Sequence, residues 1–96
     1  MVAEWKTAAH LEDHFELHGR ELRCRTAEEL DTSAQDTIIL GTRFTYRDRI
    51  TGLQRLGYYH RESARFVSTD TEGFILTHFR ADEAYAADLP YSTYKD

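Results

Sequence analysis

Apolar side chains recur at helical spacing near the start of the chain, which predicts a helix over residues 7–18. Its apolar positions, separated by three and four residues, are Ala8, Leu11 and Phe15. Thr7 precedes them and is a suitable N-cap, because its hydroxyl can accept a hydrogen bond from the first turn. Gly19 follows them, and we expect it to end the helix in the left-handed conformation.

A second helix is predicted to begin after Thr26. The run Thr26-Ala27-Glu28-Glu29 has the form of a capping box, with Thr26 as the cap and Glu29 at the third helical position. The apolar periodicity that follows is weak and ends near Ala34. Residues 37–40 are rich in β-branched side chains and favour a strand, which Gly41 interrupts.

From position 43 onward the pattern changes to short alternating segments, which are typical of strands. Four strands are predicted, over residues 43–47, 56–60, 65–69 and 74–80. The turn at 70–73 ends in Gly73, which can supply a positive φ. In the last strand, alternation places Ile75, Thr77 and Phe79 on one face, and His78 and its alternate neighbours on the other.

Helices first and strands after them predict an α+β fold, with two N-terminal helices packed on a four-stranded antiparallel meander. The 96 residues fit a single domain over residues 1–96. We expect a helical part over residues 7–36, the sheet over 37–80, and an irregular C-terminal arm over 81–96.

Membrane and secretory features are not expected in this chain. No apolar run approaches the roughly 20 residues that a membrane helix needs. The first residues lack a basic segment followed by an apolar stretch, so no signal peptide is predicted. Cys24 is the only cysteine, so no internal disulfide can form. These features favour a cytoplasmic protein.

The net charge of −5 argues against a generally basic nucleic-acid binder, but the charge is unevenly distributed. Residues 37–65 carry six arginines and two carboxylates, whereas both flanking segments are acidic. Guanidinium groups suit phosphate, and interleaved tyrosines could stack on bases, so this segment is a candidate RNA surface. Its candidate binding residues are Arg43, Arg47, Arg55 and Tyr58. The alternative is a solvated sheet face whose tyrosines simply form strands well.

Three histidines spaced by four residues, His10, His14 and His18, lie along one edge of the first predicted helix. Such a stripe could chelate a metal, but it lacks the glutamate of the protease motif and an obvious further ligand. A histidine at the end of this helix could instead act as an acid or base on the sheet. The third alternative is that all three are ordinary helix residues.

The end of the last predicted strand is the other candidate for chemistry. Thr77, Phe79 and Arg80 combine a hydroxyl, an aromatic ring and a cation within four positions. They could line a site, or they could be core and rim residues of an ordinary strand.

Taken together, three pieces of sequence resemble the colicin D-like nuclease domains of the barnase/EndoU/colicin/RelE-like ribonuclease group. They are Leu11-x-x-His14-Phe15-x-x-His18-Gly19-x-Glu21-Leu22, Thr26-Ala27-Glu28-Glu29 and Gly73-Phe74-Ile75-Leu76-Thr77-His78-Phe79-Arg80. The resemblance covers roughly residues 10–94. It implies an α+β fold and metal-independent RNA cleavage without a cofactor, typically of tRNA. In that reaction a 2′-hydroxyl attacks the adjacent phosphate and leaves a 2′,3′-cyclic phosphate. It also implies a toxin-like protein with a cognate antitoxin or immunity partner.

The family's catalytic histidine, which precedes a small residue, falls on His18 before Gly19. Its last-strand hydroxyl falls on Thr77, its aromatic residue on Phe79, and the following basic residue on Arg80. The resemblance therefore implies that His18, Thr77 and Arg80 are catalytic. Phe79 is expected to bind substrate as a stacking or packing wall, and His14 to be a neighbour of His18, either in the same substrate-binding pocket or in the core.

The sequence also departs from the family at several positions. Glu16 and Leu17 replace lysines that precede the family's histidine, and Tyr85-Ala86-Ala87 stands where many stand-alone relatives carry a His-Gly pair. Threonine and phenylalanine replace the family's serine and tryptophan in the last strand. A catalytically inactive homologue that binds RNA or protein is therefore the alternative prediction.

Overall fold

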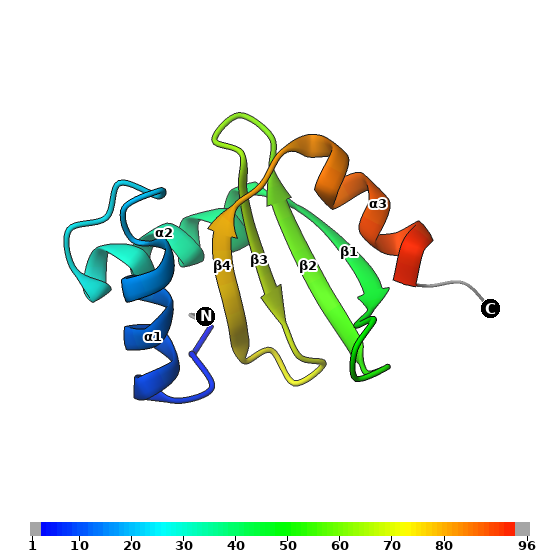
Figure 1. Ribbon diagram of the computed structural model, residues 1–96, viewed down its shortest axis with the longest axis horizontal. Helices are drawn as coiled ribbons and strands as arrows, with labels where there is room; N and C mark the ends of the chain where they lie inside the picture. The colour runs from blue at the N-terminus through cyan, green and yellow to red at the C-terminus, as the bar shows by residue number, and fades with distance from the viewer. Residues whose placement is uncertain (1–2, 94–96) are drawn as a thin grey trace.

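The computed structural model describes residues 3–93 of the chain and has the α+β architecture that the sequence predicts. Two N-terminal helices precede a four-stranded antiparallel sheet, and a third helix follows it (Figure 1). The strands pair in chain order, so the predicted meander is confirmed. None of the helices within residues 3–93 has the length and apolar character needed to cross a membrane.

Helix α1 spans Ala8–His18 and begins at the predicted cap. The hydroxyl of Thr7 accepts a hydrogen bond from the His10 backbone N–H at 3.0 Å. Gly19 closes the helix, but its φ of −55° is right-handed, so the expected left-handed ending is wrong. A glycine is needed there for space, because a Cβ at this position would lie 2.6 Å from the Phe15 carbonyl oxygen.

Helix α2 spans Ala27–Leu40, six residues beyond its predicted end. The cap is as expected, with the Thr26 hydroxyl accepting from the Glu29 N–H at 3.1 Å. The strand expected at 37–40 is wrong, because this segment continues the helix. Thr37 is buried and donates its hydroxyl to the Ser33 carbonyl at 2.8 Å, so packing and a local hydrogen bond override its β-propensity.

The sheet consists of strands β1 (Thr42–Arg47), β2 (Gln54–His60), β3 (Arg65–Thr69) and β4 (Ile75–Arg80). These bounds lie within two residues of the predicted ones at every end. The turn before β4 also agrees with the prediction, since Gly73 has a φ of +95°.

Helix α2 passes behind the sheet in Figure 1 and covers one of its faces. Ala34 of α2 forms a fully buried core with Val67 of β3 and Ile75 of β4. Ile75 reaches this face because a register shift at Ser68/Thr69 pairs it with Thr69, whereas Thr77 pairs with Ser68. The expectation that Ile75 shares a face with Thr77 is therefore wrong, and the irregularity between them is the reason.

The other face of the sheet is aromatic and is flanked by α1 beside β4 and by helix α3 (Glu83–Thr93) beside β1 (Figure 1). The predicted irregular arm is therefore a helix over most of its length, and residues 94–96 lie outside the described residues. Tyr85 packs edge-on against Phe66 and Phe79, and Ala86 is buried. These contacts stabilise α3. The sequence did not predict this helix, because its amphipathic pattern is weak and it contains Pro90.

Candidate active site

Helix α1 carries a row of stacked rings that continues onto the sheet. The ring centroids of His10 and His14 lie 5.1 Å apart, and those of His14 and His18 lie 5.6 Å apart. Trp5 flanks the row at 5.8 Å from His14, and Phe79 of β4 follows at 5.6 Å from His18. The four-residue spacing therefore produces a ladder that leads from the helix to the end of β4.

His14 is half-buried in the middle of this row. Its Nδ1 lies 3.5 Å from the Thr77 hydroxyl oxygen, a long contact that joins α1 to β4. Burial lowers the pKa of His14 below its ordinary value, and the neighbouring His10 and His18 lower it further. His14 is therefore neutral at pH 7 and able to accept a proton.

His18 is held by a carboxylate that also grips the sheet. Its Nδ1 lies 3.0 Å from Glu21 Oε1, while Glu21 Oε2 accepts a hydrogen bond from the Arg80 backbone N–H at 2.9 Å. Desolvation opposes ionisation of Glu21, but the hydrogen bonds from His18 and Arg80 lower its pKa overall. The ionised Glu21 thus fixes the His18 ring through Nδ1.

Glu21 is the member of this site that the sequence analysis missed. It appeared there only as one position of the motif that carries the family resemblance, although its position three residues after His18 places both on one side of the chain. The available signal was the His-x-x-Glu spacing at the end of a helix. Its second bond, to the backbone of β4, depends on tertiary structure alone.

The structure brings the two histidines of α1 close to the end of β4, as expected, but the histidine that contacts Thr77 is His14 and not His18. Thr77 contacts His14, whereas His18 contacts the Phe79 ring and reaches the Arg80 backbone through Glu21. The two histidines are neighbours in the ring stack, so the hydroxyl and both imidazoles lie within one connected cluster.

The candidate arginines and tyrosine of the strands are divided between the two faces. Strand register places Arg55 on the face of Thr77 and Phe79, where it lies close enough to influence Tyr46. The other three side chains belong to the opposite face and are not brought to the histidines; they are Arg43, Arg47 and Tyr58.

Those three residues have other surroundings. Tyr58 packs against the core beneath α2, and Arg43 is exposed on the edge strand β1. Arg47 donates a hydrogen bond to the Gly52 carbonyl at 2.9 Å and so supports the β1–β2 turn. Side chains alternate along a strand, so residues 43 and 47 lie on one face of β1 while Phe44 and Tyr46 lie on the other.

His78 lies on β4 next to Thr77 but serves a different purpose. Its side chain is completely buried under α2. Nδ1 donates to the Phe66 carbonyl at 2.9 Å, and Nε2 accepts from the Ser33 hydroxyl at 2.8 Å, while Arg65 donates to the same hydroxyl. Desolvation by burial lowers the pKa of His78 to about 4, so it is a neutral structural residue.

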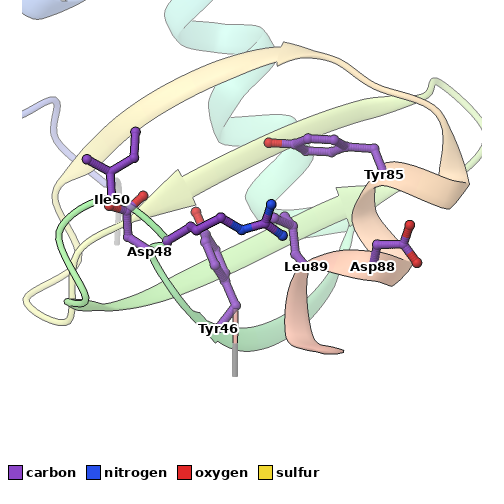
Figure 2. A pocket seen from close by; sticks show the side chains of 7 residues that line it. Tyr46, Asp48, Ile50, Tyr85, Asp88 and Leu89 are labelled. Atoms are coloured by element: carbon purple, nitrogen blue, oxygen red, sulfur yellow. The ribbon is translucent and has the colours of Figure 1, made fainter. Parts of the chain in front are cut away.

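A hollow of about 470 Å³ lies away from the histidines, between the β1–β2 turn and α3. Figure 2 shows Tyr85 and Leu89 of α3 across from Tyr46 and the turn that follows it, with Asp88 beside them on the helix. Two carboxylates, those of Asp48 and Asp88, and one guanidinium, that of Arg49, line this hollow, so its net charge is negative and it is poorly suited to phosphate.

Metal binding finds no support in the described part of the chain. Within residues 3–93, no three histidine, cysteine or acidic side chains gather in a way that could hold a metal ion. The planes of the His10 and His14 rings are inclined by only 11°, so the rings stack on each other.

Comparison of the chain with known proteins finds no matching family model, no matching curated protein and no matching solved structure.

Proposed function

We propose that this protein is a metal-independent endoribonuclease of the toxin type, acting in the cytoplasm, with tRNA as the foremost candidate substrate. The observation that carries the proposal is the junction of α1 and β4, where two histidines meet a hydroxyl and a buttressing carboxylate. A cognate antitoxin or immunity protein would restrain such an enzyme.

RNA cleavage by an internal 2′-hydroxyl needs one group to take a proton and another to give one. In the proposed reaction His14, which is neutral, takes the 2′-hydroxyl proton as the 2′-oxygen bonds to phosphorus. The bond from phosphorus to the 5′-oxygen then breaks, and protonated His18 gives its Nε2 proton to that oxygen. The products are a 2′,3′-cyclic phosphate and a 5′-hydroxyl, and no cofactor takes part.

The neighbouring residues support this division of work. Glu21, hydrogen-bonded to His18 Nδ1, orients that ring, as a carboxylate commonly does for a catalytic histidine. Thr77 positions the ring of His14 or the substrate hydroxyl. Arg55, on the same face as Thr77, supplies positive charge for the phosphorane, whereas the Arg80 side chain, expected to be catalytic, lines the neighbouring hollow with Arg65.

The test is cleavage of total RNA and of purified tRNA by the complete chain in the presence of EDTA. Wild-type protein is expected to produce fragments that end in a cyclic phosphate. His18→Ala is expected to lower the rate by about 10²–10⁴, because it removes an acid–base group. The matched control is His10→Ala, which removes a ring from the same row at its far end.

Absence of cleavage by wild-type protein, or equal rates for wild type and His18→Ala, would refute the assignment. Loss of cleavage on adding EDTA would refute the metal-independent mechanism. Circular dichroism of each variant separates a catalytic loss from a loss of folding.

The second candidate is a non-catalytic binding module of the same fold, and one surface feature favours it. Leu17 is 71% exposed on α1, beside the exposed Glu16, at positions where the resembled family has lysines. An apolar, acidic helix face suits a protein partner better than RNA. A complex with a protein that Leu17→Lys abolishes, in a chain that cleaves no RNA, would establish this function instead.

A further inference from the structure

A hollow of about 300 Å³ lies next to His18, on the far side of Glu21. It is formed where the loop between α1 and α2, the turn between β2 and β3, and the ends of β3 and β4 meet. Its lining side chains are Glu21, Arg23, Ser63, Arg65 and Arg80. Arg23 and Ser63 were not expected at a site, because they belong to loops far apart in the sequence and no local pattern joins them.

The balance of charge in this hollow favours an anion. Three guanidinium groups face one carboxylate, in a protein whose net charge is −5. That carboxylate, Glu21, is already engaged by His18 Nδ1 and by the Arg80 backbone N–H. Neither of these two hydrogen bonds involves the Arg80 guanidinium.

Arg65 provides a fixed positive charge at the inner side of the hollow. It donates to the Ser33 hydroxyl and, through Nη2, to the Leu22 carbonyl at 2.8 Å. These bonds hold the guanidinium between α2 and the loop after α1. Arg23 and Arg80 are exposed, so they can close on a bound group from the rim.

The backbone at this hollow adopts conformations that side chains disfavour. Within residues 3–93, the non-glycine residues with positive φ are Arg23, at 59°, and Ala64, at 56°. Arg23 lines the hollow, and Ala64 joins Ser63 to Arg65. Hydrogen bonds secure both loops: the Cys24 N–H donates to Gly19 at 2.8 Å and the Ala81 N–H to Ala64 at 2.9 Å. Residues kept in such conformations are concentrated at ligand sites.

We propose that this hollow binds a phosphate group, and that its ligand is the RNA phosphate adjacent to the one cleaved at His18. The identity of the ligand as RNA rests on the proposed ribonuclease function. Arg23 and Arg80 bind the phosphate oxygens from the rim, and Arg65 supplies the fixed charge. The Ser63 hydroxyl lies 2.7 Å from His60 Nδ1 and can donate to the phosphate when that nitrogen is the donor in the bond between them. Bound there, the phosphate sets the register of the RNA chain relative to His18.

The first arm of the test titrates the complete ¹⁵N-labelled chain with inorganic phosphate at low ionic strength. Saturable shifts are expected at residues 21–23, 63–65 and 80. Arg23→Gln and Arg80→Gln are each expected to weaken the phosphate affinity by about tenfold, because each removes a charge-assisted contact. Arg43→Gln, the same loss of charge on the exposed strand β1, is the matched control and should leave the affinity unchanged.

The second arm measures binding of a short oligoribonucleotide to the His18→Ala chain at several salt concentrations. Arg23→Gln in that background is expected to reduce the slope of log affinity against log salt by about 0.7, the value for one phosphate contact on a single strand. Equal slopes with and without Arg23, together with phosphate shifts at the hollow, would refute RNA as the ligand and leave a site for free phosphate.

The two proposals can fail separately. Phosphate shifts at the hollow in a protein that cleaves no RNA would uphold the anion site and refute the ribonuclease. RNA cleavage with no phosphate shift at residues 21–23, 63–65 or 80, or with equal weakening by Arg43→Gln, would uphold the ribonuclease and overturn the phosphate site.

Discussion

Strand β4 has a histidine on each side of it, and the two differ in almost every physical respect. His78 belongs to the strand and is sealed under α2, whereas His14 comes from α1 and is half-buried against Thr77. Burial lowers the pKa of both side chains, to about 4 for His78. Their different burial gives them different roles. A fully buried imidazole can only stabilise the fold, whereas a half-buried one can also exchange protons with a ligand.

The partners of the two histidines reinforce this difference. Both ring nitrogens of His78 are engaged, by the Phe66 carbonyl and the Ser33 hydroxyl. The partners of His14 are two further imidazoles, a tryptophan, the distant Thr77 hydroxyl and the Leu76 backbone. A saturated hydrogen-bond network is a feature of structure, whereas a row of stacked titratable rings is open to chemistry.

The largest expected effect is on catalysis at the rim. His14→Ala should lower the rate of RNA cleavage by about 10²–10⁴, because the variant lacks the group that takes the 2′-hydroxyl proton. Its unfolding midpoint in urea should change much less than that of His78→Ala, since His14 is only half-buried. Cleavage rates and urea titrations of both variants check the comparison, and retention of full activity by His14→Ala would break it.

The next effect is on stability in acid and concerns His78. Its pKa is about 4 in the folded protein and about 6.5 when unfolded, so the unfolded chain binds the proton first. The contribution of this group is complete above pH 6.5 and is lost as the pH falls towards 4. The loss amounts to about 3 kcal/mol of unfolding free energy.

Urea titrations between pH 7 and pH 4 measure this dependence, with His78→Gln as the non-titrating control. The difference between the two chains is the relevant quantity, because carboxylates also titrate at the lower end of this range. The charged or titratable groups that act on His78 are Arg65, His18 and His14. Parallel pH profiles for wild type and His78→Gln would contradict the sealed environment.

A smaller effect is expected on the aromatic face at Gly57, where the Phe44 ring lies flat against the strand. A Cβ at this position would come within 2.5 Å of that ring. Gly57→Ala should therefore destabilise the protein by about 1–3 kcal/mol through overpacking. Pairing it with Phe44→Leu should recover part of the loss in a urea titration; no recovery would place the strain elsewhere.

The smallest expected effect is on stability and concerns the N-cap of α2, the helix that covers the His78 face of the sheet. Thr26→Ala removes the hydroxyl that accepts from the Glu29 N–H and should cost about 1 kcal/mol. Because α2 lies on the opposite side of the sheet from His14, cleavage by the folded variant should be unchanged. Thr26→Ser is the control that keeps the hydroxyl, and a lower turnover in Thr26→Ala would show that the two faces are coupled.

The elements that could be predicted best from the sequence are those that depend on neighbouring residues alone. The caps at Thr7 and Thr26, the turn at Gly73 and the strand β3 are each specified within a few residues. The prediction was wrong at residues 37–40 and at α3, where contacts from distant parts of the chain select a helix. Thr37 is buried against the sheet and Tyr85 packs on Phe66 and Phe79, which no local window contains.

The candidate site was predictable to a similar extent. The four-residue spacing placed His14 and His18 on one edge, and the match to the last strand singled out Thr77, Phe79 and Arg80. Which of the two histidines contacts Thr77 depends on how α1 lies against β4: the resemblance grouped His18 with Thr77, whereas the contact is made by His14. The division of the strand arginines between two faces was available from alternation, but only pairing with neighbouring strands identifies the face.

By itself, the sequence determined the helix-then-meander order, the residue types available for proton transfer and the concentration of arginine after residue 36. These follow from periodicity, capping and composition, which are properties of neighbouring residues. Only the tertiary structure decided that Glu21 bridges His18 to β4, that His78 is sealed, and that Arg23, Arg65 and Arg80 share one hollow. Burial, charge and hydrogen bonding between distant segments are set by packing, because each depends on which segments lie next to one another in space.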